Sequence, residues 1–337
     1  QLAALVTSAK NDRFAGVIAN RVWKRLMGWG IVEPVDDWEN AKPSHPELLV
    51  FLARHLTTHG YDVKHIARLI FNSRAYQSSA VNPAAGSPAA TRHAPLKRRM
   101  SAEQLVDSLF SAAGKKLGCE ELTFDSDGRQ AIEAFQNFGV PRRAWEFTSL
   151  SNERDRPALS LPVAQTITDV LVRFGWREAR QAAITDRENA VNVLQPAIIA
   201  NGIVGNRIAR LSDDSALTEL CLQSAPVDTL VSDVFQRLLC RVPNPTEAQT
   251  FRGLLQEGYD SRIINGAAKT KAGLVAGGRV VSWSNHLDPA ATQIKMELEK
   301  AARDGEPVTQ RLGAPLRERA EDMIWALINS PEFVFVP

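Results

Sequence analysis

Cysteine is scarce in this chain, and the few cysteines present form no metal-binding or redox motif. The 337 residues include only Cys119, Cys221 and Cys240. None of them lies in a C-x-x-C or C-x-x-C-H pattern, which excludes the motif-based zinc, haem and thioredoxin-like sites. We therefore expect no cofactor in this segment and no disulfide framework. Cys221 and Cys240 fall on apolar helix faces, where we expect buried thiols.

Long apolar runs and an excess of one charge are also missing. No run approaches the roughly 20 apolar residues that span a bilayer, so we expect no membrane span. Lys and Arg number 40 against 38 Asp and Glu, which gives no reason to expect a nucleic-acid partner. The basic run Lys97-Arg98-Arg99 has no interleaved aromatic residues, and we interpret it as a surface or interdomain feature. The glycines of 273–278 lack the Gly-Lys-Ser/Thr of a phosphate loop.

Helix signals are abundant instead. Phe14 to Leu26 keep a period near 3.6 residues, with Asn11 as the expected cap and Gly28 as the stop. In the segment Ser44-His45-Pro46-Glu47, Ser44 is the expected cap and Glu47 the capping-box carboxylate. Asp62 and Ser101 are expected to cap two further helices. In the second half we expect a helix from Arg187 to Leu211, broken at Pro196.

These signals predict a mainly α fold, with helical lobes joined by long irregular segments and at most short strands. We expect an N-terminal helical lobe over 1–80, a linker or exposed loop over 81–96, a helix plus irregular segment over 97–161, and a C-terminal helical lobe over 162–337. The chain lacks an initiator Met, and its start does not resemble a signal peptide. We interpret it as part of a longer protein.

Several sequence blocks resemble one family in the same order. They are Asn20-Arg21-Val22-Trp23, 30–37, Ser44-His45-Pro46-Glu47-Leu48-Leu49, 60–66, Asn72-Ser73-Arg74-Ala75-Tyr76-Gln77, 100–105 and 325–333. Together they are similar to the domain of unknown function 1553, which is abundant in planctomycetes.

The resemblance implies the C-terminal domain of a large exported protein, periplasmic or at the cell surface, often with cytochrome-c-like modules. It implies that the partners are N-terminal modules of the same polypeptide, and that any haem belongs to a missing N-terminal module. It supplies no catalytic residues that can be carried over to this sequence.

An acidic loop and the helix start after it supply the first candidate site. Asp36, Asp37 and His45 are the candidates for acid–base catalysis or for a hard cation, in a segment that also holds Glu33, Glu39 and Glu47. The alternative is that the carboxylates cap helices, make turns or are solvated. For metal binding we expect none, with Asp36, Asp37 and His45 as the candidates if one exists.

The helix before this loop carries Asn20, Arg21 and Trp23, which are candidates for ligand binding. Arg21 has the geometry to clamp a carboxylate. That carboxylate belongs either to a ligand or to Asp36 or Asp37, and we favour the internal brace.

Two further polar groups are interpreted as structural. His55 and His59 are spaced i, i+4 as metal ligands often are, but the sequence shows no third ligand at a diagnostic distance, and His65 lies ten residues from His55. Ser284-Asn285-His286-Leu287-Asp288 suggests a triad, but triad members converge from separate elements. Asp288 before Pro289 is expected to be a helix cap.

We therefore expect a non-catalytic interaction or scaffold domain. One alternative is an enzyme or metal-dependent site around Asp36, Asp37 and His45, acting on carbohydrate or redox substrates. The other is a polysaccharide-binding module that uses exposed Trp29, Trp38 and Trp283, with a polysaccharide as the partner.

Overall fold

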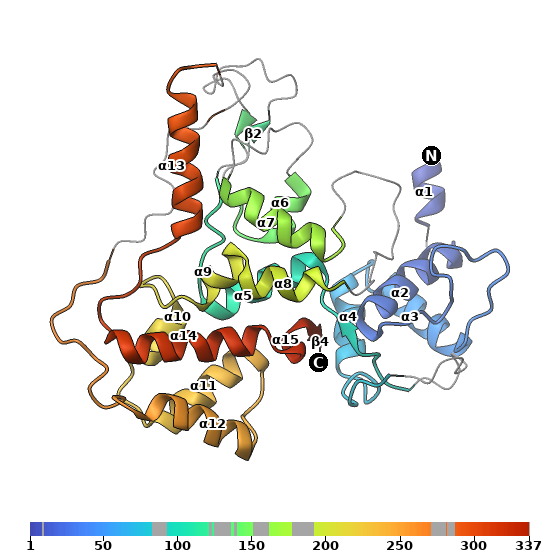
Figure 1. Cartoon of the computed structure of the whole chain (residues 1–337). Helices are drawn as coiled ribbons and strands as arrows, with labels where there is room; N and C mark the ends of the chain where they lie inside the picture. Colours follow the sequence, from blue (N-terminus) through green and yellow to red (C-terminus); the bar gives the residue numbers. More distant parts are fainter. Residues whose placement is uncertain are drawn as a thin grey trace. The chain divides into compact units, whose positions relative to one another are not determined.

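The computed structural model of the chain describes residues 1–8, 10–82, 93–120, 123–124, 136–137, 140–150, 162–176, 192–270, 281 and 287–336. Helices dominate this part of the chain, and its strands are two residues long (Figure 1). The expected mainly α class is therefore confirmed. None of the described helices is long and apolar enough to cross a bilayer.

The chain divides into two compact units. Unit 1 comprises residues 1–99, 181–187 and 335–337, and unit 2 comprises residues 100–180 and 188–334. The border at Arg99 and Met100 lies just past the segment 81–96 in which we expected a linker. The finer four-part division stays a prediction.

Unit 1 is built on one long amphipathic helix, α2, and two shorter amphipathic helices that pack on it. Its elements are α1 (Leu2–Val6), α2 (Asp12–Met27), α3 (Pro46–Thr58), α4 (Val63–Phe71), β1 (Arg98–Arg99) and β4 (Phe335–Val336). The buried core of this unit takes Trp23 and Met27 from α2, Leu52 and Leu56 from α3, and Ile66 from α4. The hydrophobic spacing in the sequence predicts these inward faces, because residues three or four apart share one side of a helix.

The capping predictions hold at α2 and α4 and fail at α3. Asn11 accepts from the Phe14 amide, and Asp62 accepts from the Lys64 amide. Ser44 does not cap α3, because its hydroxyl donates to the Ile31 carbonyl at 3.0 Å. The N-cap of α3 is His45, without a side-chain cap, so the capping box with Glu47 was wrong. The Ser44 hydroxyl is used instead to tie the helix start to the preceding loop.

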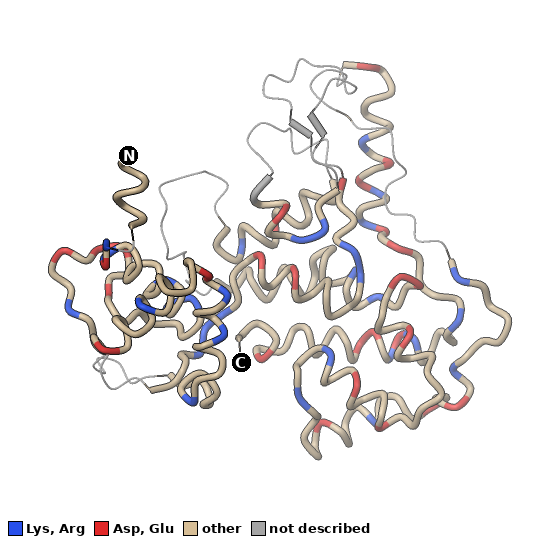
Figure 2. The backbone as a smooth tube through the Cα atoms, turned by 180° about the vertical axis from the view of Figure 1, so that it is seen from behind, with Lys and Arg blue, Asp and Glu red and all other residues tan. Residues whose placement is uncertain are grey.

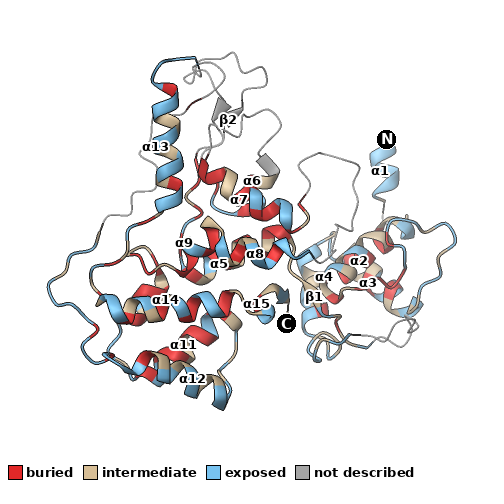
Figure 3. Cartoon of the chain, in the orientation of Figure 1, coloured by how far each residue is buried: buried red, intermediate tan, exposed pale blue. Residues whose placement is uncertain are grey.

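Unit 2 is a larger helical assembly with one continuous core. Its elements are α5 (Ala102–Ala113), β2 (Thr123–Phe124), β3 (Gln136–Asn137), α6 (Ala144–Leu150), α7 (Pro162–Arg173), α8 (Leu194–Asn201), α9 (Ile203–Ala209), α10 (Ala216–Cys221), α11 (Val227–Leu239), α12 (Pro245–Gln256), α13 (Ala291–Asp304), α14 (Ala314–Ile328) and α15 (Pro331–Val334). Helices α5, α7, α9, α11 and α14 bury most of the core, whereas α13 is largely exposed (Figure 3). Ser101 caps α5, as expected, and the structure adds a capping box with Gln104.

The break between α8 and α9 falls at Gly202 and not at Pro196, which corrects our expectation. Pro196 lies in the first turn of α8, where its missing amide hydrogen matters little. At Gly202 a side chain is excluded, because an added Cβ would lie 2.1 Å from the Ile198 carbonyl oxygen. Gly202 has an extended backbone where the two helices meet, and the close approach of the Ile198 carbonyl explains why the residue is glycine.

The short strands form two-stranded antiparallel pairs, β1 with β4 and β2 with β3. Acidic and basic residues are interspersed along the described backbone of unit 2 (Figure 2), in keeping with the balanced composition. Cys240 is exposed as the left-handed C-cap of α11, so the expected burial of its thiol was wrong, whereas Cys221 is buried.

Candidate functional site

The acidic loop after α2 is tied back to that helix by its carboxylates. The Arg21 guanidinium pairs with Asp36 at 2.7 Å, and the Lys24 ammonium pairs with Glu33 at 3.1 Å. The internal brace expected for Arg21 is therefore confirmed, and its partner is Asp36. Asp37 accepts from the Glu39 amide at 3.1 Å, which is a local turn bond.

Asn20 makes the buried part of the same tie. Its side-chain amide donates to the Val32 carbonyl at 2.9 Å and accepts from the Val32 amide at 3.1 Å. The side chain is fully buried, and it satisfies both polar groups of one loop residue. Asn20 and Arg21 are thus both engaged in holding the loop.

Trp23 and His45 lie elsewhere, in a hollow of about 440 Å³ within unit 1. This indole hollow is lined by Trp23, Trp29, His45, Leu48, Arg74, Ala75, Ser78 and His93. The structure therefore brings together two of the sequence candidates, Trp23 and His45. Asp36 and Asp37 are not among the lining residues.

Two indoles and one imidazole are packed at the hollow. The rings of Trp23 and Trp29 meet edge to face at 5.4 Å, and the Trp29 ring lies 5.6 Å from that of His45. The His45 Nδ1 lies 3.0 Å from the Ser44 hydroxyl oxygen. Edge-to-face packing fixes both indoles in place, so the wall of the hollow is preorganised.

The hydrogen-bonding groups of the two indoles are used differently. The Trp29 Nε1 donates to the Ala94 carbonyl at 3.2 Å. The Trp23 Nε1 is buried and has no hydrogen-bond partner in the part of the chain that the structure describes. A buried N–H without an acceptor costs roughly 1–3 kcal/mol, and a bound acceptor would remove that cost.

Our sequence analysis did not select three of the lining residues, which are Arg74, Ser78 and His93. Arg74 is exposed and follows α4, and none of the ion pairs between described residues includes it. Arg74 stands in the block 72–77 that resembles the family, and this was the available signal. Because the described lining holds no Asp or Glu, the polar groups of the hollow are donors or neutral.

The tryptophans expected to form an exposed platform do not do so where they are described. Trp29 is 2% exposed, which corrects that expectation. Trp38 is half-buried and donates to the Val35 carbonyl at 2.9 Å. Trp283 lies outside the described residues, as do Ser284, Asn285, His286 and the glycines of 273–278. The expected cap at Asp288 was wrong: the N-cap of α13 is Ala290, without a side-chain cap, and Asp288 accepts from the Ala290 amide in the turn before the helix.

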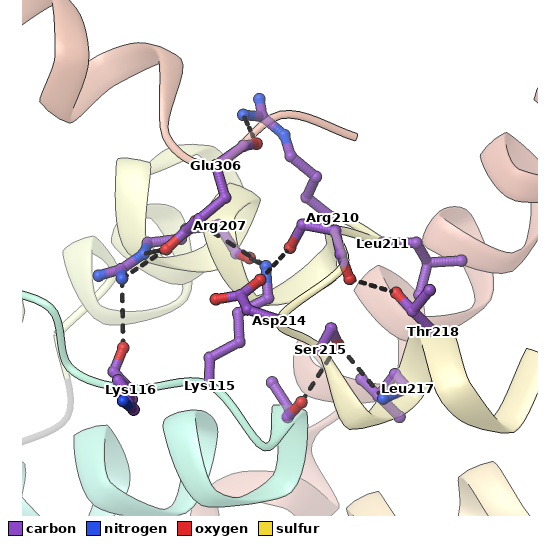
Figure 4. A network of polar contacts seen from close by, with 12 residues as sticks. Lys115, Lys116, Arg207, Arg210, Leu211, Asp214, Ser215, Leu217, Thr218 and Glu306 are labelled. Carbon is purple, nitrogen blue, oxygen red and sulfur yellow. Dashed lines mark hydrogen bonds and ion pairs between the residues drawn. The ribbon is translucent and has the colours of Figure 1, made fainter. Parts of the chain in front are cut away.

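Unit 2 contains a buried ionic network that sequence reasoning missed (Figure 4). Arg207 on α9 pairs with Glu306 at 2.6 Å and donates to the carbonyls of Lys116 and Leu117 at 3.2 and 2.5 Å. The Lys115 ammonium donates to the Arg207 carbonyl at 2.6 Å and lies 3.9 Å from Glu306. The spacing in sequence, 90 residues and more, gives no local signal of these contacts.

The burial and the close packing of this network indicate a structural role. Burial lowers the pKa of Lys115 to about 8 from its ordinary 10.5, although Glu306 opposes the shift. A Cβ at Gly118 would lie 2.6 Å from the Arg207 guanidinium, so the loop after α5 fits closely around this side chain. Because most of its donors meet backbone carbonyls, we assign the network to joining α5, α9 and the segment after α13.

Comparison with known proteins places the chain in a family without giving a function. Neither the curated proteins nor the solved structures gave a match. A family model described as "Protein of unknown function (DUF1553)", PSD1, matches residues 1–255. This match covers α1 to α11 and all of α12 but its last residue, including the acidic loop, the indole hollow and Arg207, whereas the resembling block 325–333 lies outside it. The chain therefore belongs to the DUF1553 family, as its sequence blocks suggested.

Proposed function

We propose that this chain is a non-catalytic interaction domain, and that the indole hollow of unit 1 receives an acidic group of its partner. The observation that carries the proposal is the buried Trp23 Nε1, a donor without an acceptor among the described residues, in a hollow that Arg74 also lines. A carboxylate offers two strong acceptor oxygens and a charge that Arg74 complements. A hollow of this size holds one side chain or a short segment of a partner chain.

The absence of carboxylates among the described lining residues favours binding over catalysis. A histidine base is commonly oriented by a carboxylate, and His45 has the Ser44 hydroxyl and the Trp29 ring as its neighbours. The enzyme alternative around Asp36, Asp37 and His45 has less support, since Asp36 is paired with Arg21. The polysaccharide alternative has less support because the indoles of Trp23 and Trp29 are buried.

The family membership extends the proposal to the whole protein. We infer that the partner is another module of the same exported polypeptide, periplasmic or at the cell surface, and that any haem is carried by such a module. An acidic segment of that module is the expected occupant of the hollow. Cell fractionation of the native protein tests the location, and recovery in the cytoplasm would contradict it.

The binding test uses a hexaglutamate peptide titrated into the chain, with tryptophan fluorescence and calorimetry as readouts. We expect saturable binding that Arg74→Gln weakens about tenfold, because a charge-assisted hydrogen bond contributes roughly 1.5 kcal/mol. Trp23→Phe keeps an aromatic ring but removes the N–H, and it should also weaken binding. Arg54→Gln is the matched control, since Arg54 is an exposed arginine on α3 that does not line the hollow.

The result that would overturn this proposal is the absence of binding at millimolar peptide, or equal affinity in Arg74→Gln and the control. Binding of a neutral hexasaccharide in place of the peptide would favour the polysaccharide reading. Hydrolysis of that sugar would favour the enzyme.

A further inference from the structure

The end of α3 and the start of α4 bring three histidines together, away from the indole hollow. His55 lies in the last turn of α3, His59 is its C-cap, and His65 lies in the first turn of α4. One ring nitrogen from each of them lies within 4.8 Å of the others, and this is the one cluster of three or more His, Cys, Asp or Glu side chains that meets that limit within the described chain. Our sequence analysis set His65 aside because it lies ten residues from His55, and the structure brings its ring to the other two.

The turn between the helices explains how His65 reaches His55 and His59. Gly60 and Tyr61 both adopt left-handed backbone conformations, with φ of 63° and 62°. Two such residues in a row reverse the chain within a few positions, so α4 returns beside the end of α3. The Tyr61 hydroxyl donates to the Thr7 carbonyl at 3.0 Å, which anchors a residue type that rarely adopts this conformation.

We propose that His55, His59 and His65 form a binding site for a divalent transition-metal ion of the Zn²⁺ class, with a fourth position open to water. His55 Nδ1 and His65 Nε2 lie 3.3 Å apart. Two nitrogens at about 2.0–2.1 Å from one tetrahedral Zn²⁺ are separated by about 3.3 Å. The pair is thus already spaced as two ligands of one ion.

The hydrogen bonds of His59 assign it the tautomer that a ligating imidazole needs. Its Nδ1 lies 2.9 Å from the His55 carbonyl oxygen, so Nδ1–H donates there and the lone pair stands on Nε2. A backbone acceptor on the far ring nitrogen fixes the tautomer of a ligating imidazole. The Thr58 hydroxyl, 3.2 Å from the same Nδ1, supports the same assignment because its own hydrogen is used on a backbone carbonyl.

Charged and apolar side chains both lie near the cluster. Burial and the imidazoles of His59 and His55 lower the pKa of His65, and the Asp62 carboxylate opposes this while Arg68 adds to it. The Phe51 ring packs on His55 at 4.4 Å and gives the cluster one apolar side.

Metal binding requires one adjustment. The rings of His59 and His65 are stacked at 3.8 Å with an interplanar angle of 13°, and they must rotate before both lone pairs face one ion. His59 is exposed, so this rotation meets little steric resistance. Imidazole nitrogens favour Zn²⁺, Cu²⁺ and Ni²⁺ over Mg²⁺ and Ca²⁺.

The experiment titrates Zn²⁺ into the full chain, prepared without a histidine tag, by calorimetry with a competing chelator. We expect one ion per chain with a dissociation constant in the micromolar range or below. His59→Gln and His65→Gln should each weaken binding by roughly 100-fold or more, because a ligand is lost outright and loss of an outer-shell partner alone weakens metal binding 10–100-fold. His93→Gln is the matched control, a histidine outside the cluster. Co²⁺ should show the visible bands of a four-coordinate ion in the unaltered chain.

Circular dichroism of each metal-free variant distinguishes ligand loss from misfolding, and His55→Gln provides a third variant if one fails to fold. Zn²⁺ binding weaker than millimolar, or equal affinity in the cluster variants and His93→Gln, would overturn the proposal. The hollow and this cluster share no residue, so failure of one proposal leaves the other standing.

Discussion

Unit 1 and unit 2 both use arginine to hold a loop against a helix, but at very different depths. In unit 1 the side chains of Arg21 and Asp36 are 43% and 37% exposed, whereas in unit 2 those of Arg207 and Glu306 are 6% and 2% exposed. Water screens the charges of Arg21 and Asp36. The charges of Arg207 and Glu306 have little contact with water, so polar groups of the protein must stabilise them. Similar ion pairs should therefore respond very differently to mutation.

In unit 1 the buried side chain that holds the loop is the neutral amide of Asn20, whereas in unit 2 the buried side chains are charged. Asn20 satisfies both backbone groups of Val32 without placing a charge in the core. Unit 2 instead buries one carboxylate with two cations, and Glu306 Oε2 has no hydrogen-bond partner among the described residues. Removing one charged group should therefore destabilise unit 2 more than unit 1.

The largest effect is expected for Glu306→Gln. This change removes the carboxylate that pairs with Arg207 and lies 3.9 Å from Lys115, so both buried cations lose that negative charge and keep their backbone carbonyl partners. We expect the free energy of unfolding to fall by about 3–5 kcal/mol, as when one member of a buried ion pair is removed. Urea denaturation followed by circular dichroism measures it. A loss below about 1 kcal/mol would mean that water reaches the network.

A smaller effect is expected from the protonation of Lys115. Its folded-state pKa of about 8 lies below the ordinary 10.5, so the unfolded chain binds more protons between these pH values. The free energy of unfolding should therefore rise with pH from about 8 to 10.5, by at most roughly 3 kcal/mol. Lys115→Met serves as the reference, because the rise attributable to Lys115 is missing from it. Parallel pH curves for the two proteins would contradict this assignment.

The smallest effect is expected for Arg21→Gln in unit 1. An exposed pair contributes about 0.2–1 kcal/mol, and added salt weakens it. One position earlier, Asn20→Leu leaves the buried amide and carbonyl of Val32 without partners and should cost at least about 2 kcal/mol. Urea curves of the two variants provide the comparison. If Arg21→Gln proved the more damaging of the two, exposure would not be the deciding difference.

The local signals in the sequence were sufficient for the mainly α class and for many helix ends. Asn11, Asp62 and Ser101 cap the helices that they were expected to cap, because a cap depends on residues within three positions. The capping prediction failed at Ser44, whose hydroxyl bonds to the distant Ile31 carbonyl. A competing tertiary partner is not visible in a local pattern.

The candidate sites divide in the same way. The sequence selected Trp23 and His45 as separate features, and the fold placed them in one hollow with Arg74 and His93. The sequence also selected Arg21 and the acidic loop, with Asp36 or Asp37 as the expected partner. In the structure the partner of Arg21 is Asp36.

The sequence by itself determined the helical class, the family and several caps, because these depend on periodicity, ordered blocks and neighbours along the chain. Only the tertiary structure decided which polar groups meet. The reversal at Gly60 and Tyr61 carried His65 back to His59, and helix packing brought Arg207 to Glu306, 99 residues away. Burial and convergence depend on chain reversals and packing, and neither is encoded in the spacing of the residues that meet.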